Sequence, residues 1–210
     1  IEDAEIMVQR RNTAAAELGV VHRHYLGTAQ LDLTYAQRVG VPWFGGQRDA
    51  ANHNPASATF DYRLQTLDLG LIAPFKLADQ SLRWISAFRG QHSKDVLYTA
   101  DQFAIGNRYT VRGFDGERTL AAERGWYFRN ELEMPLAQSG QSIYAGLDHG
   151  RVSGPSAQTL AGRALTGAVA GARGSVFGLN YDLFAAWALK RPEGFETRRP
   201  VAGFQLSYQF

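Results

Sequence analysis

The chain has 210 residues, of which 45% are hydrophobic and 12% aromatic, and its formal net charge at pH 7 is +2. This aromatic content excludes a disordered tail, and charges of both signs that nearly cancel give little support for a nucleic-acid partner. The longest apolar run, residues 183–189, is much shorter than the about 20 residues of a membrane-spanning helix, and the absence of cysteine excludes disulfides, thiolate metal sites and cysteine nucleophiles.

Hydrophobic and polar residues alternate with a period of two along most of the chain, which is the period of a β-strand. Leu31, Leu33 and Tyr35 alternate with polar residues, and the same pattern returns around Trp126 and Trp187. The fourth such segment changes phase at residues 66–67, which indicates either a bulge or an incorrect strand assignment there. We predict about ten strands, near residues 3–10, 14–26, 29–39, 59–74, 81–91, 125–136, 142–150, 163–173, 177–190 and 199–210.

The connections between these segments are alternately short and long. Short connections are expected at residues 27–28, 76–80, 137–141 and 174–176, and long ones at 40–58, 92–124, 151–162 and 191–198. This alternation is typical of an outer-membrane barrel, which has short periplasmic turns and longer extracellular loops.

Strand length and aromatic residues favour the same fold. Strands of about ten residues or more suit a tilted crossing of the hydrocarbon, and aromatic residues lie near the strand ends, at Trp84, Trp126, Trp187, Tyr208 and Phe210. We therefore predict an all-β fold, a transmembrane antiparallel β-barrel, which closes either alone or with earlier strands because an open edge would leave backbone groups unpaired in lipid. A soluble β-sandwich or a small-ligand barrel is the alternative, since the local alternation is the same.

Motifs of common enzymes are missing from the sequence, which has no G-x-S-x-G, P-loop, G-x-G-x-x-G or H-E-x-x-H. Asp148 and His149 are neighbours, but neighbouring strand residues point to opposite faces and do not form a dyad. His22 and His24 share a face without a third ligand, so a polar wall is favoured over a metal site. We predict no catalytic, cofactor-binding or metal-binding residue, and no enzyme.

The connection 92–124 is far longer than usual, which implies a functional element. At its centre Val111, Arg112, Gly113 and Phe114 form the motif VRGF, in which Gly113 permits a tight backbone. An arginine between apolar residues is unusual in a solvated loop. If this loop enters a confined pore, Arg112 must find a carboxylate, because an unpaired buried charge costs several kcal/mol.

The alternation suggests which carboxylates face that pore. Taking Trp126 as lipid-facing places the charged residues of its strand in the lumen, namely Arg129, Glu131 and Glu133. Asp148 lies in the next strand, on the same face as Gly146 and Gly150. These glycines leave space for a loop backbone to approach the wall.

The VRGF motif in a long loop directly before a strand, together with the C-terminal Phe210, resembles the signature of the Omp85 superfamily. Within it the chain most resembles the TpsB transporters of two-partner secretion, in particular the filamentous haemagglutinin transporters. The resemblance covers essentially all 210 residues. Because the chain does not begin with Met and Ile1 follows no leader, we also expect a processed chain or a part of a longer one.

The resemblance implies that residues 1–210 are the C-terminal part of one outer-membrane barrel domain of about 16 strands, with POTRA domains upstream. It implies that the loop 92–124 folds into the lumen and that Arg112 pairs with Asp148 in the segment 146–150. Glu131 and Glu133 remain alternative partners, and a solvent-exposed Arg112 is the simpler alternative. The alternating residues at the C-terminus resemble the signal that the barrel assembly machinery reads, or form an ordinary closing strand: Phe204, Leu206, Tyr208 and Phe210.

The function that the resemblance implies is a pore in the bacterial outer membrane that secretes a large unfolded partner protein of the adhesin, haemagglutinin or haemolysin type, without a cofactor. The expected partners are this polypeptide, outer-membrane lipid and the barrel assembly machinery, but no nucleic acid. Three alternatives remain: an Omp85-type factor that assembles other outer-membrane proteins, a passive porin, and a lipid-modifying enzyme at the barrel rim.

Overall fold

The computed structural model describes residues 11–137 and 139–208, whose regular structure is almost entirely β. Over these residues nine long strands form one antiparallel sheet, in which each strand pairs with the long strand before it. They are β1 (Ala14–Leu26), β2 (Ala29–Val41), β3 (Arg63–Leu77), β4 (Gln80–Ser93), β7 (Arg124–Pro135), β8 (Gln141–Ser153), β9 (Ala164–Val176), β10 (Leu179–Lys190) and β11 (Val201–Tyr208).

The connections contain the remaining regular structure. A hairpin of β5 (Phe103–Ile105) and β6 (Leu120–Ala122) lies between β4 and β7, with the 3₁₀ helix Thr99–Asp101 before it. Two more 3₁₀ helices are Trp43–Gly45, between β2 and β3, and Ser156–Thr159, between β8 and β9. Within this part of the chain no helix has the length and apolar character needed to cross a membrane.

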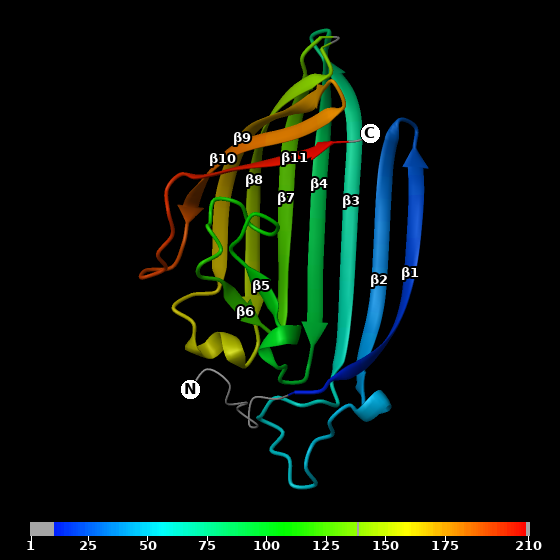
Figure 1. Cartoon of the computed structure of the whole chain (residues 1–210), viewed down its shortest axis with the longest axis vertical. Helices are drawn as coiled ribbons and strands as arrows, with labels where there is room; N and C mark the ends of the chain where they lie inside the picture. Colours follow the sequence, from blue (N-terminus) through cyan, green and yellow to red (C-terminus); the bar gives the residue numbers. More distant parts are fainter. Residues whose placement is uncertain (1–10, 138, 209–210) are drawn as a thin grey trace.

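The sheet is curved and, over the described residues, open, with β1 and β11 at its two edges (Figure 1). The connection between β4 and β7, with its hairpin, lies in front of β7 and β8 in this view. We call the face that this connection covers the inner face, and the opposite one the outer face. Glu131 and Asp148 lie on the inner face, where they contact the connection, and Trp126 lies on the outer face.

The outer face exposes large apolar side chains. Trp126, Leu132, Leu147 and Trp187 are 38%, 41%, 59% and 41% exposed. A soluble sandwich would bury such residues between two sheets, whereas an outer-membrane barrel places them against lipid. The predicted all-β, antiparallel fold is therefore confirmed, and the sandwich alternative is wrong.

The predicted strands between residues 14 and 208 are found, with shifted ends, while the predicted strand 3–10 lies outside the described residues. The predicted start of one strand at residue 59 is wrong, because β3 begins at Arg63. The amide of Thr59 donates to the carbonyl of Val96, and the carbonyl of Tyr62 accepts from the amide of Gly40. Residues 59–62 therefore belong to the preceding connection.

Two local predictions are also wrong. β3 pairs with both neighbours in continuous register through residues 66–67, so the expected bulge does not occur there. The change of phase arises because Leu64 faces inward and packs with Tyr62 and Leu97. The turn expected at 174–176 lies at residues 177–178, since Phe177 and Gly178 have φ angles of 50° and 81°, as a two-residue hairpin turn requires.

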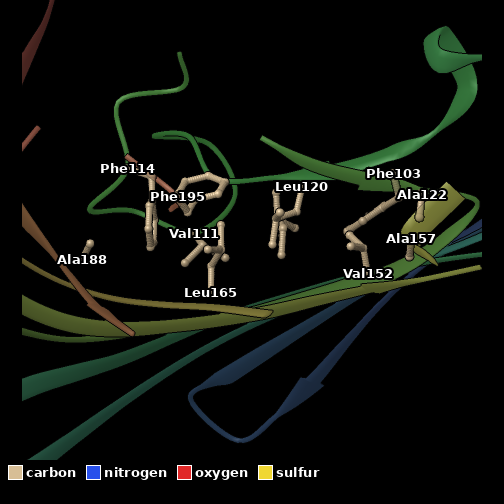
Figure 2. Packing of buried hydrophobic residues seen from close by; sticks show 11 residues of the cluster. Phe103, Val111, Phe114, Leu120, Ala122, Val152, Ala157, Leu165, Ala188 and Phe195 are labelled. Carbon is tan, nitrogen blue, oxygen red and sulfur yellow. The ribbon is translucent and has the colours of Figure 1, made fainter. Parts of the chain in front are cut away.

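A hydrophobic cluster fixes the long connection to the sheet (Figure 2). Phe114 from the connection packs edge-on against Phe195, with ring centroids 5.7 Å apart. Burying each large apolar side chain contributes about 1.5–3 kcal/mol, so the connection is a packed part of the fold. The buried members are Phe103, Ile105, Val111, Phe114, Leu120, Ala122, Val152, Ala157, Leu165, Ala188 and Phe195.

Candidate functional site

Arg112 lies at the centre of the long connection and contacts two carboxylates of the inner face. Its Nε and Nη2 donate to Oδ2 and Oδ1 of Asp148, both at 2.7 Å, and its backbone amide donates to Oδ2 at 2.9 Å. Nη1 donates to Oε1 of Glu131. Arg112 is 4% exposed and Asp148 is 1% exposed. The structure thus brings the motif arginine and Asp148 into a two-pronged contact away from solvent.

The surroundings of Arg112 favour its charged form. Burial acts to lower the pKa of Arg112, but the hydrogen bonds and charges of Asp148 and Glu131 raise it above its ordinary value. Two-pronged contacts between arginine and a carboxylate are among the stronger hydrogen-bonded pairs. Removing one partner of a buried pair costs about 3–5 kcal/mol, because the other charge is left uncompensated. This contact is therefore able to hold the connection against the wall.

Two glycines let the backbone of the connection reach the sheet. A β-carbon at Gly167 in β9 would overlap the carbonyl oxygen of Arg112, and one at Gly113 would overlap the backbone of Trp187 in β10. Gly113 also has a φ of 99°, which residues with a β-carbon rarely adopt. At both positions a glycine is required by close approach of two backbones.

The expectation that Gly146 and Gly150 make room for the loop is correct only for Gly150. A β-carbon at Gly150 would meet Cγ2 of Val111 at 2.8 Å. A β-carbon at Gly146 would instead overlap the carbonyl of Asn130 in the adjacent strand β7. This glycine therefore permits close packing of β7 and β8 and does not contact the loop. The sequence analysis did not single out Gly167. The available signal was a glycine on the same strand face as the apolar residues Leu165 and Val169, which lie two positions before and after it.

A row of charges continues along the inner face beyond Asp148. Glu131 accepts a hydrogen bond from Nη2 of Arg173 at 2.5 Å, in addition to that from Arg112. Glu133, which is 0% exposed, pairs with Arg83 and lies 3.6 Å from Nη1 of Arg173. Of the three carboxylates considered from the sequence, Asp148 and Glu131 contact Arg112, while Glu133 contacts other arginines.

A polar pocket of about 420 Å³ opens beside this row of charges. Arg173 and Asp182 line it, with Nε of Arg173 3.8 Å from Oδ2 of Asp182. The hydroxyl of Tyr144 donates to Oδ1 of Asp182 at 2.7 Å, and its ring lies 4.0 Å from the guanidinium carbon of Arg173. The wall here presents charged and hydroxyl groups rather than an apolar ligand cavity.

The residues that follow the motif contact the connection between β10 and β11. Asp115 accepts hydrogen bonds from the amides of Arg198 at 2.8 Å and Glu117 at 3.1 Å. Burial acts to raise the pKa of Asp115, but these hydrogen bonds lower it below its ordinary value. Nη2 of Arg198 donates to Oε1 of Glu117 at 3.0 Å. Two long connections are therefore joined by contacts that the sequence did not indicate.

Glu123 joins the base of the long connection to the connection between β8 and β9. It is 0% exposed and accepts the hydroxyl of Ser156 at 2.5 Å and the amide of Ser156 at 3.2 Å. Sequence reasoning missed Glu123, and the available signal was an acid directly after the apolar residues 120–122.

The other residues singled out from the sequence lie in two places. Val111 and Phe114 of the motif are 0% and 1% exposed in the hydrophobic cluster. Phe204, Leu206 and Tyr208 belong to the edge strand β11 and are 66%, 54% and 61% exposed, while Phe210 lies outside the described residues.

The histidines considered as metal ligands lie on β1. The rings of His22 and His24 are stacked, with centroids 5.9 Å apart. In residues 11–137 and 139–208 no three side chains of His, Asp or Glu gather in a way that could hold a metal ion.

Comparison with known proteins gives consistent matches. Residues 1–174 match the family of haemolysin secretion/activation proteins ShlB/FhaC/HecB. The outer membrane transporter CdiB-2 of Burkholderia pseudomallei is 42% identical over 100% of this chain and 36% of its own length. The hemolysin transporter protein HpmB of Proteus mirabilis is 28% identical over 65% of this chain and 24% of its own length. The chain thus spans only about a third of the first of these relatives.

Solved structures share the fold. CdiB from Acinetobacter baumannii matches 98% of this chain and 35% of its own chain, with a TM-score of 0.84 and 33% identity. CdiB from Escherichia coli has the same TM-score of 0.84 at 21% identity, which shows the fold alone.

Proposed function

The chain belongs to the ShlB/FhaC/HecB family of haemolysin secretion/activation proteins and lies in the outer membrane, and from this premise we propose that it forms the C-terminal part of a pore for two-partner secretion. The exported substrate would be a large partner polypeptide that crosses the pore unfolded, of the adhesin, haemagglutinin or haemolysin type. POTRA domains upstream of residue 1 would receive this polypeptide in the periplasm.

The observation that carries the proposal is the buried contact between Arg112 and Asp148. It supports a role for the long connection as a brace or plug, because the connection covers the inner face of the sheet and is held there by a charged pair rather than by apolar packing alone. A passive porin needs no such attachment at the centre of its lumen.

The inner wall supports the passage of an unfolded chain. Arg173, Asn180 and Asp182 line an open polar pocket. Such groups offer hydrogen bonds that are replaced readily as a backbone moves past, whereas an apolar lumen would retain hydrophobic side chains. We propose that these residues line the path of the exported polypeptide.

The test uses the full-length protein co-expressed with its partner protein. Arg112→Ala and Asp148→Ala should abolish secretion into the medium while the barrel still reaches the outer membrane at normal amounts. Arg118→Ala, which removes an exposed arginine of the same connection that pairs with Glu196, is the matched control and should secrete normally. Normal export by both site variants would reject the brace.

Two further measurements separate the alternatives. Exchanging the charges, Arg112→Asp with Asp148→Arg, tests direct pairing through partial rescue of secretion. Depletion of the protein should leave the amounts of unrelated outer-membrane barrels unchanged, and a fall in those amounts would favour the assembly factor. Large and steady conductance that Arg112→Ala does not alter would favour the porin.

A further inference from the structure

The outer face carries basic residues at the end of the sheet where the long connections lie. Four of them lie at the ends of the neighbouring strands β3, β4, β7 and β8. We call them the basic band: Arg63, Lys94, Arg124 and Arg151.

Strand register places the basic band at one end of the sheet, along a line that is staggered across the four strands. Gln65 pairs with His92, so Arg63 and Lys94 lie two positions beyond this pair on the same face. Trp126 pairs with Arg151, and Arg124 lies two positions from Trp126 on the same face. Trp126 pairs with Gly90 as well as with Arg151, so Arg151 lies four positions from Lys94 along the strands. The band therefore covers three interstrand spacings, about 14–15 Å, and about 13 Å along the strands.

The charges of the basic band are not neutralised within the described part of the chain. Among the ion pairs of the described residues, none includes Arg63, Lys94, Arg124 or Arg151. Arg63, Lys94 and Arg151 are exposed, and Nε of Arg124 is buried without a hydrogen-bond partner among the described residues. An unpaired buried nitrogen is costly, and a bound anion would satisfy it.

Two acids lie near one end of the basic band. Asp61 and Asp95 line an open pocket of about 680 Å³ together with Arg63 and Lys94. Asp95 accepts the backbone amide of Arg63 at 2.7 Å, but neither carboxylate forms an ion pair with the band. Four cations against two acids leave a positive balance at this rim.

The rest of the outer face on these strands is uncharged. Next to the band lie the rings of Phe88 and Trp126, with centroids 6.4 Å apart. The outer-face residues at the other end of the four strands, near the short turns, are apolar: Leu77, Leu82, Met134 and Ile143. The cations therefore gather at one rim only.

We propose that the basic band binds the phosphate groups of a lipid in the outer leaflet of the outer membrane. The long connections mark the extracellular side, so the band lies at the rim that faces that leaflet's headgroups. Trp126 and Phe88 then lie at the interface, and the leucines between them and the short turns face acyl chains. Guanidinium groups match phosphate oxygens in pairs, and cations spread over about 14–15 Å across the strands and about 13 Å along them suit a headgroup that carries more than one phosphate.

The proposal uses the proposed function only for the position of the barrel in the outer membrane. Lipid binding requires neither an exported polypeptide nor movement of the long connection. It is measured on purified protein, and a failure here is therefore distinct from a failure of secretion.

The experiment uses the full-length protein in a neutral detergent, incubated with bisphosphorylated lipid A, with bound lipid measured by native mass spectrometry. Replacing Arg124 and Arg151 by glutamine should lower the affinity about thirtyfold, which corresponds to two cations of about 1 kcal/mol each. Replacing both by lysine keeps the charge and should preserve most of the binding. The matched control replaces Arg118 and Arg198, which pair with loop acids, by glutamine and should bind like the wild type.

Three probes define the ligand. Dephosphorylated lipid A should bind the wild type no better than it binds the glutamine variant, and neither phosphatidylglycerol nor inorganic phosphate should displace bound lipid A efficiently. The proposal is overturned if the wild type retains no lipid A, if dephosphorylated lipid A binds as well, if either competitor displaces lipid A efficiently, or if the control variant loses the same affinity. Heat-modifiable migration on gels shows that each variant contains a folded barrel.

Discussion

Replacing Gly167 by alanine tests whether the long connection is held against the wall by backbone contact. A β-carbon at this position would overlap the carbonyl oxygen of Arg112, and distances below 3.0 Å from a β-carbon are essentially never observed. Gly167 is the fourth residue of β9 and pairs with Asp148 in β8 and Ala188 in β10. Because Gly167 is paired on both sides, we expect the connection to lift rather than the strand to move.

The expected magnitude follows from the contacts that would be lost. Arg112 donates to Asp148 at 2.7 Å, 2.7 Å and 2.9 Å, and a displacement of an ångström takes these atoms beyond hydrogen-bond distance. Separating a buried ion pair costs about 3–5 kcal/mol. The docking equilibrium of the connection should therefore shift by a factor between about 10² and several times 10³.

A cysteine reporter measures this shift, since the chain has no cysteine of its own. Val111 is 0% exposed, so the thiol of Val111→Cys should resist a membrane-impermeant maleimide in the parent protein and react rapidly when Gly167→Ala is added. Gly70→Ala is the matched control, because a β-carbon there meets only Cβ of Asp32 at 3.8 Å. Equal protection of the reporter in both variants would refute the close backbone contact.

Three further predictions concern other contacts of the connection. With the same reporter, Asp148→Asn should increase labelling more than Glu131→Gln, because Asp148 accepts three hydrogen bonds from Arg112 and Glu131 accepts one; the reverse order would contradict this ranking. Glu123→Ala should lower the free energy of unfolding by about 2–3 kcal/mol in denaturant titration, because Ser156 loses the acceptor of its amide and hydroxyl; unchanged stability would show that water replaces it. Burial, and after it the neighbouring Asp101, raises the pKa of the Tyr62 hydroxyl to about 12. The stabilisation that comes from its neutral form is therefore complete below the ordinary pKa of about 10 and is lost as the pH rises through 12. An ultraviolet difference titration against Tyr62→Phe should have its midpoint near pH 12, and Asp101→Asn should lower that midpoint.

The strands and their faces could be predicted from the sequence because the alternation of side chains is a local property. A residue such as Leu132 indicates the direction of Glu131 without knowledge of the partner strand. Alternation does not predict the structure where a distant contact overrides the local pattern. Leu64 faces inward to pack with Leu97, which produced a false bulge, and Phe177 continues the alternation of β10 although it lies in the turn.

The site was only partly accessible from the sequence. Alternation placed Asp148, Glu131 and Glu133 on one face but did not choose among them, and the resemblance to a known family supplied that choice. Arg112 reaches Asp148 because the backbone of the loop contacts the sheet at Gly167. This glycine lies in a different strand from all three carboxylates. The contact of Glu123 with Ser156 is hidden for the same reason, since it joins two connections that are 33 residues apart in the sequence.

The carboxylates of the inner face differ in the ion-pair partners that each would keep if the connection moved away from the sheet. Glu131 would keep Arg173, and Glu133 would keep its present partners. Among the ion pairs of the described residues, Asp148 takes part only in that with Arg112. An uncompensated buried carboxylate is costly, so withdrawal would impose its electrostatic cost mainly at Asp148. The electrostatic control of docking therefore lies mainly with one carboxylate, while the other ion pairs of the inner face do not depend on the connection.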